Sequence, residues 1–529
     1  MSTTTDPCSP DATPEIVPID TSARRFRANV LANLLYFVFN AGLQLWFTRY
    51  LIDHLGVATY GLVPLATNMT NYMAILTVAL SGSVGRFLTI DLARGDVETA
   101  NKTFNTSLFA TIVLAIALLP VVGALSWFSP HILNIPEGEE NGTRFLLVCT
   151  GFAFLLNTVG SNFACSTFAK NRFDYQRAVD VVGQAVQVGV AVTLFSVLGA
   201  KLWQVGIGIA AMSVMRQAGY QITWRKLTPE LRIRPRSFDR TRLREVLGMG
   251  AWLTVNQFGA VLFLQIDLLV VNMVIGAYAA GLYAPGVQMS TVLRSMAGLV
   301  TGVLFPTFAA TYAVHDSERL MRISHRVVKV LGLAMALPVG LACGFARPLL
   351  TLWLGPEFGG VAPLVVLMLV HLSVNVAVVP LFGVNTAMNK VMWPGIVTCA
   401  LGLVNLGLAI LLAGQFGWGM YGVAAAGAIV LTAKNAVFTP MYAAFVLRQP
   451  LLVFSRAVAP CAVGTACVTP VCYCVSTSAG LSSAVGLLVA GLAVCALAVP
   501  VMAWLGLTSS DRAALRAIAS MPRVAAKAF

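Results

Sequence analysis

The chain has 529 residues, of which 58% are hydrophobic and only 11% are charged, and its formal net charge is +14. A mean hydropathy of +0.80 excludes an ordinary soluble domain. Apolar runs of about 20 residues, enough to cross a bilayer as a helix, recur along the chain without the alternating pattern of barrel strands. The composition therefore predicts an all-α membrane protein.

The first element is a polar tail. Residues 1–27 begin with MSTTTDPCSPDATPEIVPID, a stretch rich in proline and threonine that predicts disorder. It has neither the apolar centre nor the cleavage site of a signal peptide. We therefore expect a cytoplasmic tail at 1–27 and an uncleaved first span.

Fourteen transmembrane helices are predicted after the tail, as two groups of six and a final pair. The first group lies at 28–51, 61–85, 105–128, 145–168, 178–199 and 203–223. The second group lies at 247–274, 283–309, 327–346, 361–384, 393–413 and 420–446. The final pair lies at 454–475 and 483–506.

The segment between the two groups is predicted to be a cytoplasmic linker. Residues 225–246, RKLTPELRIRPRSFDRTRLREV, are polar and rich in arginine. Apolar Leu243, Val246 and Leu247 at its end indicate an amphipathic segment on the membrane surface. A similar pattern at 508–521 predicts an amphipathic helix in the cytoplasmic tail at 508–529.

The positions of lysine and arginine set the predicted orientation. With the N-terminus inside, 28 of the 35 basic residues lie on the cytoplasmic side, 4 on the opposite side and 3 inside spans. This bias predicts that both termini are cytoplasmic. It also assigns the net charge to loop topology and an anionic inner leaflet, so nucleic acid is not an expected partner.

Two stretches 220 positions apart, LGVATYGL at 55–62 and IGAYAAGL at 275–282, indicate an internal repeat. We place them at equivalent outer turns, where glycine allows a tight reversal. The matched glycines are Gly56 with Gly276 and Gly61 with Gly281. Further matches at an offset of 218 pair Pro120 with Pro338, Gly199 with Gly417, and Arg216 with Lys434.

Each copy of the repeat contains six spans, an even number, so the two copies are parallel in the membrane. This pattern predicts an N-lobe at 28–224, a C-lobe at 247–447 and two added spans at 448–507.

Motifs for metal, cofactor or covalent chemistry are not found in the sequence. Cys472-x-Cys474 lacks a second pair and a nearby histidine, so buried packing explains the cysteines better than a metal site. His371, the one histidine inside a span, is interpreted as a packed or pore-facing residue. With no Gly-rich phosphate loop, nucleophile elbow or paired carboxylates, we expect no cofactor and no enzyme activity.

The repeat, the added pair and four phrases together resemble the polysaccharide flippases of the multidrug/oligosaccharidyl-lipid/polysaccharide exporter superfamily, often called Wzx-type. The resemblance covers 28–447 and extends to the final pair. Its matching phrases are RYLIDHLGVATYGL (49–62), FPTFAA (305–310), PLLTLWLGPEF (348–358) and FGWGMYGVAAAG (416–427).

This resemblance implies two V-shaped lobes that move an undecaprenyl-diphosphate-linked oligosaccharide from the cytoplasmic to the periplasmic leaflet of a bacterial inner membrane. Cell-surface polysaccharide biosynthesis would be the process served. Membrane lipids and other membrane proteins of polysaccharide assembly are candidate partners beside the lipid-linked substrate. Such a headgroup needs a polar, preferably cationic path through the bilayer.

Charges inside spans are functional candidates because they are costly in lipid. Counted from an expected turn at 283, Arg294 lies about 16 Å deep and Asp267 about 12 Å deep on neighbouring spans. Two interpretations stay open, a plain Asp267–Arg294 ion pair or a role in substrate or proton handling. In the repeat register, uncharged Ala74 and Phe47 occupy the equivalent positions.

Three further cations are candidates for the cavity. Arg216 and Lys434 lie about 20 Å below the outer surface, one in each lobe, unless their spans face the lobe interiors. Arg86 lies at the inner end of the second span, where snorkelling to anionic lipid is the alternative. In related lipid II flippases, arginines on the first, second and eighth spans line the cavity, and Arg294 and Arg86 match these by helix and not by motif.

Amide side chains on the first, second and seventh spans complete the expected path. Hydrogen bonding to sugar hydroxyls is one interpretation, and bonding between helices is the other. These residues are Asn33, Asn40, Gln44, Asn68, Asn71, Asn256, Gln257 and Gln265.

Two alternative functions stay open. A multidrug exporter of the same superfamily typically needs acidic pocket residues, whereas Asp267 is here the only acid expected to be well buried, against three cations. A membrane polysaccharide polymerase or ligase would be expected to carry a large external loop, whereas the longest one predicted spans about 129–144.

Overall fold

The computed structural model describes residues 23–313, 317–388, 390–509 and 511–512, and within these ranges the chain is helical with no strand. The predicted tail as far as residue 22, and the predicted surface helix beyond Arg512, lie outside the described residues. The predicted all-α class is confirmed.

The first half of the chain forms long helices at every predicted span. They are α1 (Ala23–Leu55), α2 (Val57–Tyr72), α3 (Ala74–Ala93), α4 (Val97–Ile132), α5 (Glu140–Ala169), α6 (Phe173–Leu198) and α7 (Leu202–Leu227). The second predicted span is divided at Met73 into α2 and α3.

The second half is more broken. Its elements are η1 (Pro235–Ser237), α8 (Arg240–Leu264), α9 (Ile266–Val274), α10 (Ala277–Ala313), α11 (Ser317–Gly344), α12 (Ala346–Leu354), η2 (Pro356–Val361), α13 (Ala362–Leu369), α14 (Leu372–Ala377), α15 (Val379–Ala387), α16 (Met392–Ile410), η3 (Leu411–Gln415), α17 (Gly419–Ala433), η4 (Lys434–Phe438), α18 (Thr439–Val446), α19 (Val453–Ser478) and α20 (Ala484–Gly506). The predicted seventh span bends by 45° between α8 and α9.

Nine helices in the described part of the chain are long and apolar enough to cross a membrane, and the bent pair α8–α9 brings the number to ten. All fourteen predicted segments lie in helix, but the count of fourteen membrane crossings stays a prediction. The multi-pass character of the chain is clear in either case.

The predicted turns of the repeat are present at both positions, while their outward orientation stays a prediction. Gly56 precedes α2 with φ 79° and Gly276 precedes α10 with φ 128°, backbone conformations that strongly favour glycine. Gly199 and Gly417, the matched pair further along, also have positive φ, at 74° and 69°. The helix after the second turn begins at Ala277, six residues before the expected position, so Arg294 lies midway along α10 and deeper than predicted.

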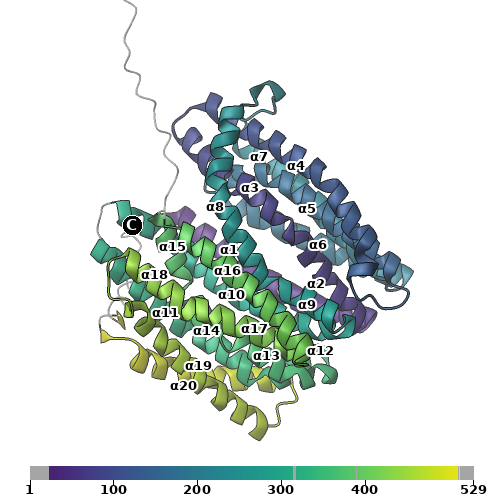
Figure 1. Cartoon of the computed structure of the whole chain (residues 1–529), viewed down its shortest axis with the longest axis vertical. Helices are drawn as coiled ribbons and strands as arrows, with labels where there is room; N and C mark the ends of the chain where they lie inside the picture. The colour runs from purple at the N-terminus through teal and green to yellow at the C-terminus, as the bar shows by residue number, and fades with distance from the viewer. Residues whose placement is uncertain (1–22, 314–316, 389, 510, 513–529) are drawn as a thin grey trace, which may run out of the picture.

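Two groups of helices are visible in Figure 1, with α3–α7 in one and α10–α20 in the other. Helix α8 lies between them and contacts both α3 and α16. Helix α2 contacts α10 directly. The described helices of the two halves therefore meet along α2, α3, α8 and α10, while the residue boundaries of the two predicted lobes stay predictions.

At the end predicted to face outward, the two repeated glycine motifs touch each other. A Cβ atom added to Gly61 would lie 2.7 Å from the Gly281 nitrogen, and one added to Gly281 would overlap the Val57 carbonyl. Asn134 and Asn272 join the same end through three hydrogen bonds of 2.6–3.1 Å between their side chains and backbones. The halves thus make direct contact at the end that is predicted to face outward.

The linker between α7 and α8 is bound to α4 through its backbone. The Asn101 side chain donates to the Glu230 carbonyl and accepts from the Arg232 amide, at 3.1 and 2.8 Å. One helical turn later, Asn105 makes the same two bonds to the Arg232 carbonyl and the Arg234 amide, at 2.8 and 2.7 Å. A helical turn and two residues of extended chain span similar lengths, so both amides fit at once.

Candidate functional site

A cavity of about 430 Å³ lies where α2 meets the helices of the second half. Its polar lining includes Asn68 and Asn71 from α2, Asp267 from α9 and Arg294 from α10. Gln265, at the break between α8 and α9, also lines it. Five predicted amide and charged positions from separate elements therefore meet in one space.

The broken helix places Asp267 in this cavity. Gln265 leaves the helical path, and Asp267 follows in the first turn of α9, where a carboxylate suits the positive end of the helix dipole. The Tyr283 hydroxyl donates to Asp267 Oδ2 at 3.4 Å, whereas Oδ1 has no hydrogen-bond partner among the residues described.

Asp267 and Arg294 line the same cavity but form no ion pair within the described structure. Arg294 also makes no hydrogen bond to a described residue. The two charges still interact electrostatically across the cavity. Both interpretations, an ion pair and a role in substrate or proton handling, therefore stay predictions.

A second cavity of about 350 Å³ adjoins the first at Arg294, which lines both. It is enclosed by helices of the second half only. Lys434 contributes the other cation, and Asn256, Asn375 and Asn385 contribute amides. Arg294, Lys434 and Asn256 were predicted from the sequence. Asn375 and Asn385 were not, because they lie outside the first, second and seventh spans, from which the predicted amides come.

Lys434 is held in this second cavity without a counter-ion. Its ammonium lies 5.1 Å from the ring centroid of Phe382 and 5.5 Å from that of Phe263, distances typical of cation–π contacts. The side chain is buried, and no carboxylate of the described chain pairs with it. It opens the π-helical turn η4, a distortion that is frequent at functional sites.

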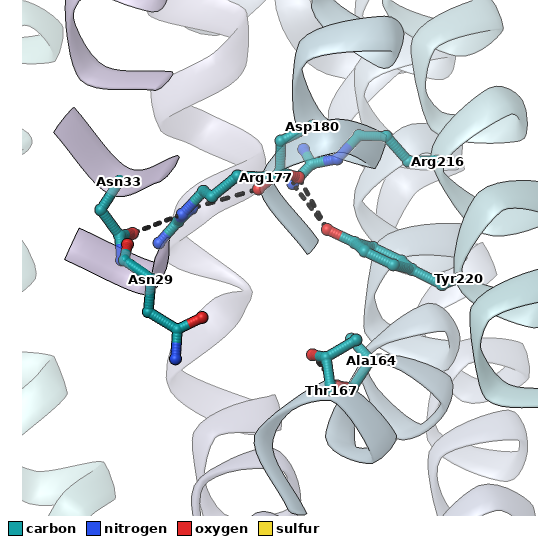
Figure 2. Close-up of polar contacts among 8 residues, drawn as sticks. All are labelled: Asn29, Asn33, Ala164, Thr167, Arg177, Asp180, Arg216 and Tyr220. Carbon is teal, nitrogen blue, oxygen red and sulfur yellow. Dashed lines mark hydrogen bonds and ion pairs between the residues drawn. The ribbon is translucent and has the colours of Figure 1, made fainter. Parts of the chain in front are cut away.

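Arg216, the repeat equivalent of Lys434, has a different environment (Figure 2). Its Nη2 atom lies 2.5 Å from Asp180 Oδ1, to which the Tyr220 hydroxyl also donates at 2.7 Å. Arg177 bonds the other Asp180 oxygen at 3.1 Å and Asn33 Oδ1 at 2.7 Å. The expectation that Asp267 is the only well-buried acid is therefore wrong, because Asp180 is only 4% exposed.

The other predicted lining residues are dispersed. Asn33 belongs to the Arg216 network and lines neither cavity. Asn40, Gln44 and Gln257 likewise line neither of the two cavities. The side chain of Arg86 lies outside the described residues. Sequence patterns thus identified the right helices more reliably than the right faces.

Two further polar residues were not among the predicted lining residues: His371, predicted to be packed or pore-facing, and Asn405, which lies near the first cavity without lining it. His371 lines the first cavity, and its Nδ1 atom lies 2.5 Å from Asn375 Nδ2. Asn405 approaches the carboxylate of Asp267 and leaves its own Oδ1 unpaired in the described structure. An asparagine inside an apolar span was the available signal. Across the described chain, no three His, Cys, Asp or Glu side chains gather as metal ligands.

Comparison with known proteins identifies a matching family and a relative that is similar over most of its length. Residues 26–312 match the family model described as polysaccharide biosynthesis protein. An uncharacterized membrane protein, EpsK of Bacillus subtilis (strain 168), is 35% identical over 434 residues, which are 82% of this chain and 86% of the relative.

Solved structures share the fold. A lipid II flippase, MurJ, in an inward closed conformation has a TM-score of 0.61 at 12% identity, covering 90% of this chain and 98% of its own. An inward-facing multidrug resistance MATE transporter has a TM-score of 0.60 at 16% identity, covering 79% and 99%. The chain therefore belongs to the polysaccharide biosynthesis protein family.

Proposed function

We propose that this protein is a flippase that moves a lipid-linked oligosaccharide, of the undecaprenyl-diphosphate type, from the cytoplasmic to the periplasmic leaflet. The proposed setting is a bacterial inner membrane with both termini in the cytoplasm. The proposed process is transport for cell-surface polysaccharide biosynthesis, without catalysis or a cofactor. Other membrane proteins of polysaccharide assembly are proposed partners.

The observation that carries the proposal is the charge of the two adjoining cavities. Among the described residues, no carboxylate lies within ion-pair distance of Arg294 or Lys434, and Asp267 is the one acid lining the first cavity. Unpaired guanidinium and ammonium groups away from water are costly. A diphosphate would supply the missing negative charge, and Arg294 can meet it with two parallel hydrogen bonds.

Transport by alternating access requires the two halves to separate at one end and close at the other. The glycine contact between α2 and α10 lies at the end predicted to face outward and supports closure there. Asp267 is the proposed coupling residue, because its unpaired Oδ1 lies beside the break in the seventh span. A proton or cation bound there would change the charge that the substrate meets.

A multidrug exporter is the second candidate, because the fold is shared with a MATE transporter at a TM-score of 0.60. Exporters of cationic drugs need negative charge in the cavity. The present cavities instead combine two cations with one acid. This balance favours an anionic substrate.

Deletion of the gene tests the proposal. If the protein is a flippase, deletion of its gene should make the lipid-linked oligosaccharide accumulate in the cytoplasmic leaflet. Restoring the wild-type gene should end this accumulation. Loss of chain extension with normal translocation would indicate a polymerase. Drug sensitivity with unchanged lipid-linked sugar would indicate the exporter.

A further inference from the structure

We infer that the second cavity is a subsite for a sugar that carries a carboxylate, with Lys434 as the group that recognises the acid. The inference rests on the proposed function and narrows its substrate class to acidic oligosaccharides. It depends on a difference between the two repeats of this chain: the matched cation has a carboxylate partner in the first repeat and none among the described residues of the second.

The repeat register identifies what Lys434 lacks. The offset of 218 that pairs Arg216 with Lys434 also pairs Asp180 with Thr398. Asp180 is the counter-ion of Arg216, whereas Thr398 lines the second cavity and bonds only its own helix, through the Pro394 carbonyl at 2.6 Å. The first repeat therefore neutralises its cation internally, and the second does not.

The second partner of Arg216 is lost in the same way. Tyr220, whose hydroxyl donates to Asp180, corresponds to Phe438, which has no polar atom to offer. Two polar partners are thus replaced while the cation is kept. Retaining a buried cation without its partners is unfavourable for the protein alone, which indicates that an external anion completes the site.

The rest of the cavity lining fits a sugar. Asn375 and Asn385 are each only 3% exposed, yet the Oδ1 atom of each has no hydrogen-bond partner among the described residues. Such acceptors match the hydroxyl and amide donors of a sugar ring. The volume of about 350 Å³ is that of a small ligand site, and Phe263 and Phe382 add apolar faces.

The second cavity holds one cation besides Arg294, which favours an acidic group with a single negative charge. Lys434 supplies one positive charge, which a singly charged carboxylate balances. Arg294, at the junction of the two cavities, remains for the diphosphate. The acidic sugar would then occupy the second cavity while the diphosphate lies in the first.

Binding of two matched probes to the purified full chain tests the subsite. Both are undecaprenyl-diphosphate disaccharides, one ending in glucuronic acid and the other in glucose. Wild-type protein should bind the acidic probe about tenfold or more tightly, the usual effect of one charge-assisted hydrogen bond. Lys434→Gln should remove the preference, and Lys434→Arg should keep it.

Thr398→Asp gives an independent test that adds a group instead of removing one. The new carboxylate would give Lys434 the kind of internal counter-ion that Asp180 gives Arg216 in the first repeat. The variant should therefore bind the acidic probe about tenfold more weakly, and its affinity for the neutral probe should be unchanged. Thr398→Asn, of matched size, should behave as wild type. Lys390→Gln removes an exposed lysine of the same half and serves as the charge control.

Each outcome has a defined meaning. Equal binding of both probes by wild type would overturn the subsite while leaving the flippase proposal intact. Unchanged preference in Lys434→Gln and Thr398→Asp would overturn the assignment of Lys434. Failure of wild type to bind either probe would instead contradict the proposed function itself.

Discussion

Asp180 and Thr398 occupy equivalent positions in the two repeats, and this difference decides whether a buried cation is structural or available. Arg216 shares Asp180 with Tyr220 and Arg177, so its charge is satisfied. Lys434 contacts two aromatic rings instead. Residues of the same class at the same repeat position thus have different expected consequences when they are changed.

Thermal unfolding should separate the two cations. Asp180→Asn leaves Arg216 and Arg177 without a carboxylate and should cost about 3–5 kcal/mol, as expected for breaking a buried pair. Lys434→Gln removes an uncompensated charge and should leave the melting temperature unchanged or higher. A lower melting temperature for Lys434→Gln than for Asp180→Asn would contradict this assignment.

Asp267 and Arg294 give a second prediction at this scale. Because the two side chains form no ion pair in the described structure, exchanging their charges should not restore transport. Oligosaccharide transport in cells should fall strongly in Asp267→Arg and in Arg294→Asp, and it should stay low in the double variant. Recovery of transport in the double variant would instead establish an ion pair.

Single residues also show what the sequence could and could not predict. The cost of burying charge in a membrane span is enough to select Asp267, Arg294 and Lys434 from the sequence alone. It does not identify Asp180 as a partner of Arg216, because the contact joins α6 to α7 and depends on how both helices rotate. Asn375 and Asn385 can be seen in the sequence as asparagines in or beside an apolar span, but which of their atoms stay unpaired depends on helix rotation in the same way.

Among the elements, the linker is held to α4 by backbone contacts that do not depend on its own side chains. Replacing Asn101 and Asn105 together by alanine should release this segment. Limited trypsin digestion should then cut faster after the exposed Arg232 and Arg236, whereas the Arg234–Pro235 bond resists trypsin in every variant. Lys102→Ala, on the same helix, is the control. Equal digestion of the two variants would show that Asn101 and Asn105 do not hold the linker in place.

The segment after α20 is anchored to α11 through Asp511. Burial opposes ionisation of this carboxyl, but hydrogen bonds from Lys329 and Thr508 outweigh it and hold the pKa of Asp511 below its usual range. A lowered folded pKa means that the anchor contributes fully above about pH 4 and is lost only as the pH falls further.

Hydrogen exchange at residues 508, 509, 511 and 512 checks this anchor. Protection relative to the intrinsic exchange rate should be constant from pH 5 to pH 8, and Asp511→Asn should reduce it throughout that range. A marked loss of protection between pH 8 and pH 5 would show that another group controls the segment.

The positions of the long helices could be predicted from the sequence, whereas the breaks inside them could not. Hydropathy located every long helix, because apolar length is a local property. The breaks at Met73 and Gln265, and the division of the tenth span into α13, α14 and α15, were not predicted. Their backbone geometry depends on neighbouring helices that satisfy the freed groups, as where the Tyr72 hydroxyl donates to the Gln265 carbonyl at 3.0 Å.

At the scale of the whole molecule, the contact between Gly61 and Gly281 joins the two halves at the end predicted to face outward. Gly61→Ala inserts a methyl group where the backbones touch and should favour separation of the halves. Cross-linking between cysteines placed at Asn134 and Asn272, in a background without native cysteines, should fall. Gly123→Ala, whose added Cβ meets nothing within 4 Å, should leave it unchanged, and equal cross-linking in both variants would contradict closure by this contact.

The most direct test of the account is translocation in liposomes that contain only the purified protein. A fluorescent undecaprenyl-diphosphate oligosaccharide is placed in both leaflets, and a quencher that cannot cross the membrane reports how fast inner-leaflet probe reaches the outside. Wild-type protein should accelerate this exchange, and the Arg294→Gln, Lys434→Gln double variant should not. No acceleration by wild type, or equal acceleration by the double variant, would contradict the proposal that these cavity cations carry a lipid-linked oligosaccharide across the membrane.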